Sequence, residues 1–425
     1  MFLLLALLLP EARAFCGTYV GPAGSALENG ISQVVTARAG DRITLTLASD
    51  VFGDTSVFGL LVPVPEALGA EDVRLADVSL FAQLDAWSAP RVVSYDCPSY
   101  ESDADSDTDT DSDSDADFDT DASGVTVEAQ FEVGDYDITV LAATGAGGLT
   151  DWLGGNGFEI PAATAPILQE YIDAGQHFLA ARVDLDTLPE GGLLSPLQLS
   201  YTSEMWSLPI RLGTTVSPGE QEVVIYALST GRDGFTAIAN YAEGTPEDDC
   251  MLPEAVDAGD FYASELDAVY GAGAMWVQEY AWAPSWCDPC AAQPPDPELI
   301  ADAGGDINGY VTRLHLRYAP EQVNQDVVLY STGSTAVDQV RLIQYDHRLE
   351  ATYPVCGVGF VADPGTCDEG TTGETGETPG GTTDDPALDD PKRPAATACG
   401  CGLGPTASGW FAGVGLLVIA ARRRR

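Results

Sequence analysis

The stretch Val125–Val133, VTVEAQFEV, and the run YDITVLAA at 136–143 that follows it decide the fold class. In the first run, apolar side chains alternate with Thr, Glu and Gln, which is the period of two of a half-buried strand. Gly134 and Asp135 supply a turn between the two runs. This arrangement predicts a β-hairpin.

Working outward, eight further segments have strand composition: ISQVVTAR, RITLTLAS, FGLLVPVP, FLAARVDL, LLSPLQLSY, QEVVIYALS, YVTRLHLRY and QVRLIQY. Helical patterns are fewer. One covers 165–174, with Pro166 in its first turn and Gly175 after its end, and a second covers 261–270, with Asp260 available as N-cap. We therefore expect a mainly β (β-rich α+β) fold of stacked antiparallel sheets with a few short helices, in an ectodomain that covers 15–367.

An acidic run, ESDADSDTDTDSDSDADFDTDAS, occupies 101–123 of this ectodomain. A calcium loop also begins with alternating aspartates, but it needs a glycine for a sharp turn and a closing glutamate. Here the alternation simply continues, so we expect a solvated, disordered insert. Weak calcium association remains an alternative, and with it calcium-dependent adhesion. The candidate calcium ligands are Asp103, Asp105, Asp107, Asp109 and Asp111.

The overall charge narrows the classes of partner. The chain has 18 Lys+Arg against 66 Asp+Glu, and its formal net charge is −48. A field of that sign repels nucleic acid, so we expect no nucleic-acid partner. No cofactor is expected beyond weakly held calcium.

The N-terminus, MFLLLALLLPEARAFC, predicts a signal peptide at 1–14 that signal peptidase would remove. Its apolar run is too short to span a bilayer. A basic n-region is missing, because the chain begins at Met1-Phe2. The alternative interpretation is a buried N-terminal strand.

The C-terminal part divides into a linker at 368–398 and a tail at 399–425. The linker consists mainly of Gly, Thr, Pro and acidic residues, so we expect it to be a disordered stalk. The tail contains Cys399, Gly400 and Cys401, then an apolar segment at about 402–421 that just suffices for a transmembrane helix. Four arginines close the chain and place its end in the cytoplasm: Arg422, Arg423, Arg424 and Arg425.

In this order of features, the tail resembles the MYXO-CTERM class of bacterial sorting signals. The resemblance implies export, processing by an intramembrane sorting protease and display at the cell surface. In that case the protein contacts the membrane through its C-terminal tail. A simple tail anchor is the alternative.

Seven cysteines lie outside the tail, and in an exported protein they predict disulfides. The candidates are Cys16, Cys97, Cys287, Cys290, Cys356 and Cys367, with Cys250 as the seventh cysteine. The short-loop pairings are Cys287 with Cys290 and Cys356 with Cys367. SWCDPC has the spacing of a thiol oxidoreductase, but prolines follow it where the motif requires a helix. We therefore expect a structural disulfide, with redox and metal sites as alternatives.

Other candidate chemistry is sparse. His315 shares one face of a predicted strand with Arg313 and Arg317, and that pattern is typical of a solvated face. Trp276, Trp282 and Trp286 are expected to pack in the core or in loops. We find no nucleophile elbow, no H-E-x-x-H and no phosphate-binding loop in the sequence, so no catalytic residue is assigned.

The ectodomain resembles a bacterial family of unknown function numbered 2330. The resemblance runs from about 15 to 361 and rests on these segments: FCGTYV, ISQVVTARAGDRITLTLASDVFGD, FGLLVPVP, LDAWSAPRVV, LQEYIDAGQHFLAARVDL, LPIRLG, TRLHLRY and WCDPC. It supports export and implies no activity. We therefore expect an exported, cell-surface protein with a non-enzymatic binding or structural role in the envelope. The alternative is an enzyme with a CxxC redox site.

Overall fold

The computed structural model describes residues 18–20, 27–29, 32–48, 51–53, 57–95, 122–123, 125–184, 195–216, 219–231, 233–288 and 293–366. Strands dominate these residues, and helices are few and short. The prediction of a mainly β fold built from stacked sheets is confirmed.

The first sheet has six strands, and every neighbouring pair in it is antiparallel. Its order is β1 (Thr18–Val20), β6 (Val57–Val64), β12 (His177–Asp184), β11 (Tyr136–Ala143), β10 (Val125–Val133) and β9 (Ala122–Ser123). The predicted hairpin is its β10–β11 pair, and Gly134 turns it with a φ of +54°. Strand β9 corrects one boundary, because the last two residues of the expected insert pair with β10.

The second sheet has nine strands and is called the large sheet below. Its order is β17 (Glu243–Gly244), β19 (Trp276–Trp282), β20 (Val311–Tyr318), β15 (Gln221–Leu228), β3 (Ser32–Ala39), β4 (Arg42–Leu47), β13 (Leu197–Thr202) and β7 (Val73–Leu75), with β22 (Asp338–Gln339) paired to β19. It is antiparallel except at β15–β3 and β17–β19, which run parallel.

Three small sheets complete the strands. One contains β14 (Ser207–Leu208), β21 (Val327–Ser331) and β16 (Thr236–Ile238), the second β18 (Cys250–Met251), β23 (Arg341–Ile343) and β8 (Arg91–Val93), and the third β2 (Leu27–Asn29) and β5 (Val51–Gly53). In the sheet of β18, β23 and β8, both strand pairs are parallel, so the expected antiparallel pairing does not extend to this sheet. This sheet brings residues from three distant parts of the chain together.

Five α-helices are described: α1 (Leu80–Ser88), α2 (Ala146–Gly155), α3 (Ala165–Asp173), α4 (Ala258–Gly271) and α5 (Pro297–Asp302). The predicted helix at 165–174 is α3, with Pro166 in its first turn. Helix α4 begins earlier than predicted, because Asp257 and not Asp260 caps it by accepting from the amides of Gly259 and Asp260. Helices α1, α2 and α5 are short and had not been predicted. Short 3-10 turns lie at Ala70–Asp72, Ala162–Thr164, Gly213–Thr215, Pro320–Gln322 and His347–Leu349.

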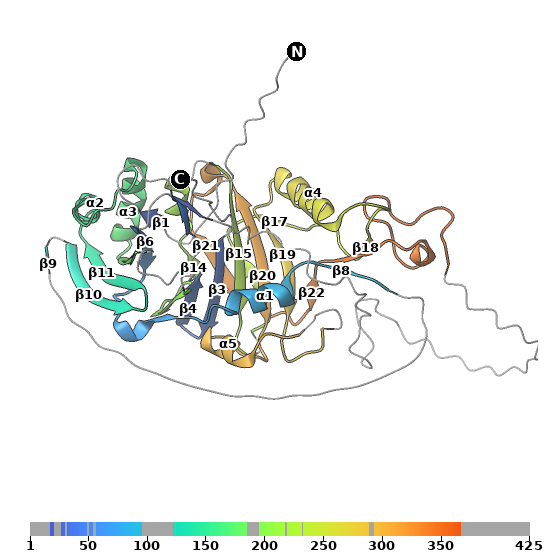
Figure 1. The fold of residues 1–425 in the computed structure, drawn as a ribbon, viewed down its shortest axis with the longest axis horizontal. Coiled ribbons are helices and arrows are strands. Elements are labelled where there is room, and N and C mark those ends of the chain that lie inside the picture. Colours follow the sequence, from blue (N-terminus) through green and yellow to red (C-terminus); the bar gives the residue numbers. More distant parts are fainter. Residues whose placement is uncertain are drawn as a thin grey trace, which may run out of the picture.

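The two larger sheets pack face to face, and helices cover their other faces (Figure 1). Strand β15 illustrates the alternation. Val223 and Ile225 enter the core between the sheets, whereas Val224 and Tyr226 pack on the opposite side with residues of α1 and α5. Helices α2 and α3 cover the six-stranded sheet in the same way. The result is four layers in the order helix, sheet, sheet, helix.

Candidate functional site

Two groups of polar side chains lie on the outer face of the large sheet, the side turned away from the six-stranded sheet. This face has two regions. Over β19, β20 and β15 it carries buried charged side chains beneath α1 and α4. Over β4, β13 and β7 it carries an open pocket beside α5.

The first region is an ion network made by Asp85, Tyr226, Glu279, Arg313 and His315. Nε of Arg313 lies 2.5 Å from Oε2 of Glu279, and Nη1 of Arg313 lies 2.5 Å from Oδ1 of Asp85. Nδ1 of His315 lies 2.9 Å from Oε1 of Glu279. The hydroxyl of Tyr226 donates to Oδ1 of Asp85 at 3.1 Å. One arginine is thereby paired with two carboxylates from different layers.

A β-bulge puts Glu279 into this network. Gln278 pairs with Leu314 and Tyr280 pairs with Arg313, so Glu279 is the extra residue of β19. The bulge lets two consecutive side chains reach the helices on the outer face. Glu279 accepts a hydrogen bond from the hydroxyl of Tyr262 in α4 at 2.8 Å. The ring of Tyr280 lies 5.0 Å from that of Trp87 in α1.

The solvated face predicted for His315 is wrong. Arg313 is 7% exposed, His315 8% and Glu279 2%. Helix α1 contributes Asp85 to this face and α4 contributes Tyr262, and the two helices exclude water from it. The alternation of β20 was interpreted correctly, but the pattern of a single strand does not reveal which element covers its polar face.

The charges of the network are mutually stabilised. Burial alone raises the pKa of Glu279, but the charges of His315 and Arg313 and the hydrogen bonds from His315 and Tyr262 outweigh it and hold that pKa at about 2. Burial and the adjacent Glu279 carboxylate raise the pKa of Tyr262 well above its usual value. Glu279 is therefore ionised and Tyr262 neutral at neutral pH.

The network continues at Arg317, the next outward-facing residue of β20. Its Nε lies 2.5 Å from Oε1 of Glu222 on β15, and its Nη1 lies 2.5 Å from Oδ1 of Asp267 on α4. Its guanidinium also lies 5.0 Å from the ring centroid of Tyr270, which is a cation–π contact. Strand β20 is thereby tied to α4 at two levels.

The geometry of His315 bears on catalysis. Glu279 orients its Nδ1, as a carboxylate orients a catalytic base, and Nε2 makes no hydrogen bond within the described residues. The closest acid to Nε2 is Glu222, whose Oε1 lies 4.0 Å away. However, Nε2 is itself buried, and a general base must come within hydrogen-bond reach of the proton it takes. The arrangement joins layers and does not present a base to a substrate.

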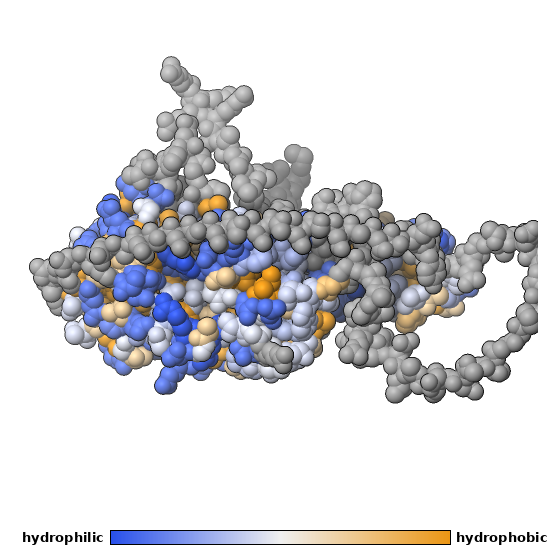
Figure 2. Space-filling model, turned by 90° about the horizontal axis from the view of Figure 1, so that it is seen from below, coloured by the Kyte–Doolittle hydropathy of each residue, from blue (hydrophilic) through white to orange (hydrophobic). Residues whose placement is uncertain are grey.

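The second region is a pocket of about 350 Å³. Its lining is predominantly polar: Ala39, Arg42, Thr44, Glu71, Asp72, Arg74, Ser200, Ala301, Asp302 and Gly304. Leu45 and Leu199 face the core between the sheets, so the adjacent Thr44 and Ser200 face the pocket. Figure 2 views the molecule from the side on which α5 lies in Figure 1, and much of the described surface there is hydrophilic with scattered apolar patches.

Hydrogen bonds hold part of the pocket wall in place. Arg74 donates from Nε to the side-chain oxygen of Gln198 and from Nη2 to the carbonyl of Asp302 at the end of α5. Nη2 of Arg42 lies 3.6 Å from Oδ1 of Asp72. The hydroxyl oxygens of Thr44 and Ser200 lie 3.4 Å apart. Arg74 is thus firmly placed, whereas Arg42, Thr44 and Ser200 are loosely paired.

Close approach of α5 to the sheet closes one side of the pocket. Gly304 follows α5 with a φ of +85°, which side chains rarely adopt. A Cβ atom at this position would lie 2.7 Å from Oγ1 of Thr44. The absence of a side chain at Gly304 therefore allows the chain to pass directly over β4.

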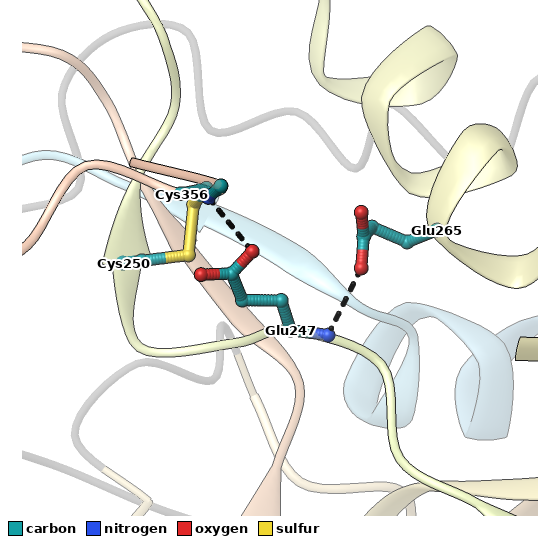
Figure 3. The surroundings of a disulfide bond; sticks show 5 residues. Glu247, Cys250, Glu265 and Cys356 are labelled. Carbon is teal, nitrogen blue, oxygen red and sulfur yellow. Dashed lines mark hydrogen bonds between the residues drawn. A yellow bond between two sulfur atoms is a disulfide. The ribbon is translucent and has the colours of Figure 1, made fainter. Parts of the chain in front are cut away.

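The disulfide in the described chain joins Cys250 of β18 to Cys356 (Figure 3). It closes a separation of 106 residues, and the two Cα atoms lie 5.1 Å apart. Beside it, the carboxylate of Glu247 accepts from the amide of Gly357, and the amide of Glu247 donates to Glu265 of α4 (Figure 3). These contacts attach the C-terminal part of the described chain to α4.

This pairing corrects the disulfide prediction. Cys356 pairs with Cys250 and not with Cys367, because the parallel sheet places β18 beside the C-terminal segment. Cys287 is also disulfide-bonded. The other predicted site residues lie outside the described residues: Cys16, Cys97, Cys290, Cys367, Cys399, Gly400, Cys401, Arg422–Arg425 and the aspartates from Asp103 to Asp111.

Two features are absent from the described residues, a metal-binding cluster and a membrane-spanning helix. No group of three or more His, Cys, Asp or Glu side chains among them is arranged to hold a metal ion. None of their helices is both long enough and apolar enough to cross a membrane. The segment expected to span, at about 402–421, lies outside the described residues.

The fold and these sites define a β-rich α+β domain of four layers, with two groups of polar side chains on the outer face of the large sheet. Residues 10–330 match the model of a family described as "Uncharacterized protein conserved in bacteria (DUF2330)", and the chain belongs to that family. No curated protein and no solved structure matches the chain. The family resemblance inferred from the sequence is thereby confirmed.

Several residues of these sites had not been singled out from the sequence. Glu279 lies between aromatic residues that were interpreted as packing residues only. Two of these, Trp276 and Trp282, are buried as expected. Asp85 and Arg42 lie in segments that carry the family resemblance and Arg74 lies outside them, but the sequence assigned no chemistry to any of the three. A usable signal was the scarcity of basic residues, because Arg313, His315 and Arg317 recur at a period of two on one strand.

Proposed function

We propose that this protein is an exported, cell-surface-anchored component of the bacterial envelope with a non-enzymatic binding or structural role. The observation that carries the proposal is the Cys250–Cys356 disulfide. Structural disulfides persist in oxidising compartments outside the cytoplasm and are rare inside it. A third bonded cysteine, Cys287, points the same way.

The ion network supports a non-enzymatic role. Arg313 is paired with both Asp85 and Glu279, and Nδ1 of His315 is engaged by Glu279. Active sites usually present a group of perturbed pKa in a cleft. Here the strongly perturbed carboxylate, Glu279, is 2% exposed, and its two oxygens contact protein groups.

The sequence of the tail supports anchoring. The arginines at 422–425 favour a cytoplasmic end, and the apolar segment before them contains Pro405, Gly409 and Gly413. Such a segment suits a transient helix that an intramembrane sorting protease opens. Cys399 and Cys401 precede it and are suited to lipid attachment, which would replace the lost helix as the anchor.

The test follows a tagged copy of the protein in its native host. The tag is inserted in the linker at 368–398, and intact cells are treated with an external protease. We expect the tag to be removed without lysis, and mass spectrometry of the membrane-extracted protein to show a mature form that lacks residues 1–14 and the arginines of the tail. A tag that stays protected until lysis contradicts surface display. An intact C-terminus at Arg425 contradicts processing, and unmodified Cys399 and Cys401 contradict lipid attachment.

A further inference from the structure

We propose that the pocket beside α5 is a binding site for a neutral, polyhydroxylated small molecule, a monosaccharide or disaccharide. Neither the family description nor the fold assigns a ligand to this part of the molecule. The pocket lies on the outer face over β4 and β13, away from the ion network of β19 and β20. Its volume of about 350 Å³ is of the size of small-ligand sites.

The pocket retains unused hydrogen-bond donors. The described contact of Arg42 is the 3.6 Å approach to Asp72, which is longer than a hydrogen bond, and its side chain is 54% exposed. Arg74 uses Nε and Nη2 but not Nη1 in the described contacts. Because a guanidinium carries five N–H donors, the two arginines have several left for a ligand.

The pocket also retains acceptors and groups of either kind. The carboxylates of Glu71 and Asp302 accept no hydrogen bond from other described side chains, and both line the pocket. The hydroxyls of Thr44 and Ser200 meet at 3.4 Å, beyond the usual distance for such a pair. Each hydroxyl can therefore still donate to or accept from a ligand.

This mixture selects a neutral ligand over a charged one. Two guanidiniums face three carboxylates in one small space. An anionic ligand would approach three carboxylates in a protein of net charge −48, and a cationic one would approach both arginines. A ligand hydroxyl can serve both, because it accepts from an unused N–H of Arg42 and donates to the carboxylate of Asp72 beside it. A sugar offers several such hydroxyls on one rigid ring.

The test uses three probes that share one ring and differ in charge: D-glucose, D-glucuronate and D-glucosamine. D-galactose and N-acetyl-D-glucosamine extend the neutral set. Binding to the full-length protein is measured by calorimetry and by saturation-transfer NMR. We expect saturable binding of at least one neutral sugar. The affinity for each of the two charged probes should be weaker than that for the neutral sugar by about tenfold or more.

Matched variants locate the binding. Arg42→Ala is expected to weaken sugar affinity about tenfold, since it removes hydrogen bonds from a charged donor. Ser200→Ala is the milder second variant. Arg182→Ala is the control, because Arg182 is also an exposed strand arginine but lies on β12 of the other sheet. Unchanged thermal melting of the variants shows that folding is intact.

Three results would overturn the assignment. The first is the absence of saturable binding for all neutral sugars of the set. The second is tighter binding of D-glucuronate or D-glucosamine than of D-glucose. The third is an unchanged sugar affinity in Arg42→Ala and Ser200→Ala, equal to that of the control Arg182→Ala. That result would place the ligand elsewhere on the molecule.

Discussion

Oε1 of Glu279 lies 2.9 Å from Nδ1 of His315, although the two residues are 36 positions apart in the chain. Both side chains are buried. The other oxygen of Glu279 lies 2.5 Å from Nε of Arg313. One carboxylate on a bulge of β19 therefore engages two basic side chains of β20 and, through Tyr262, helix α4. This residue is the most sensitive point that the structure offers for testing how the layers are joined.

Replacing Glu279 with Gln should destabilise the protein by about 3–5 kcal/mol, because it leaves the buried charge of Arg313 with only one of its two carboxylate partners. Urea unfolding followed by tryptophan fluorescence measures the change. The control is Glu71→Gln, since Glu71 is exposed and should tolerate the change within about 0.5 kcal/mol. Equal stability of the two variants would show that the ion network contributes little.

The same carboxylate makes a pH dependence testable. The pKa of Glu279 is about 2 in the folded protein, against 4.5 as its ordinary value. A depressed pKa contributes stability that is present above the unfolded pKa and is lost as pH falls through the folded one. Between about pH 5 and pH 2, the wild type should therefore lose more stability than Glu279→Gln does. Parallel losses in the two proteins would show that the shift is absent.

Opening the disulfide with Cys250→Ser and Cys356→Ser together should cost about 2–5 kcal/mol, since the bond closes a long segment. Thermal melting of the double variant under oxidising conditions measures this loss. A variant of Cys367 should leave the Cys250–Cys356 bond intact, as peptide mapping without reductant can show. A mapped Cys356–Cys367 bond in the wild type would contradict the pairing.

Gly304→Ala should lower stability by about 1–3 kcal/mol, because it combines a strained backbone with a close contact to Thr44. The matched control is Gly147→Ala in α2, where an added Cβ meets no atom within 4 Å. That change should stabilise the protein by about 0.5–1 kcal/mol, since alanine in an unstrained helical backbone reduces the conformational entropy of the unfolded chain. Effects of the same sign in both variants would contradict this account of Gly304.

Deleting residues 102–121 should leave the melting temperature nearly unchanged, since the deletion removes the aspartate alternation but keeps β9. Calorimetric titration of calcium into both proteins accompanies the melting experiment. We expect weak association that decreases with the deletion and shows no defined stoichiometry. Saturable micromolar binding that the deletion abolishes would favour the calcium-dependent alternative.

Local pattern was sufficient for most of the longer strands, although β19 and β21 were not predicted. The alternation in VTVEAQFEV and the glycine turn after it predict the β10–β11 hairpin, because a period of two follows from the backbone of a single strand. Helix α3 was also predicted, from Pro166 at its start and Gly175 after its end. Such signals depend only on residues close together in the chain, so they can be recognised in a single sequence.

The sites depend on residues that are distant in the chain. Asp85 meets Arg313 across 228 positions, and Cys250 meets Cys356 across 106. The pattern of β20 shows that Arg313 and His315 share a face, but burial of that face depends on where α1 and α4 pack. The sequence by itself therefore determined the class of fold, most of the longer strands and the family. The tertiary structure decided which charges are buried, which cysteines pair and where a pocket remains open, because these depend on how the four layers pack.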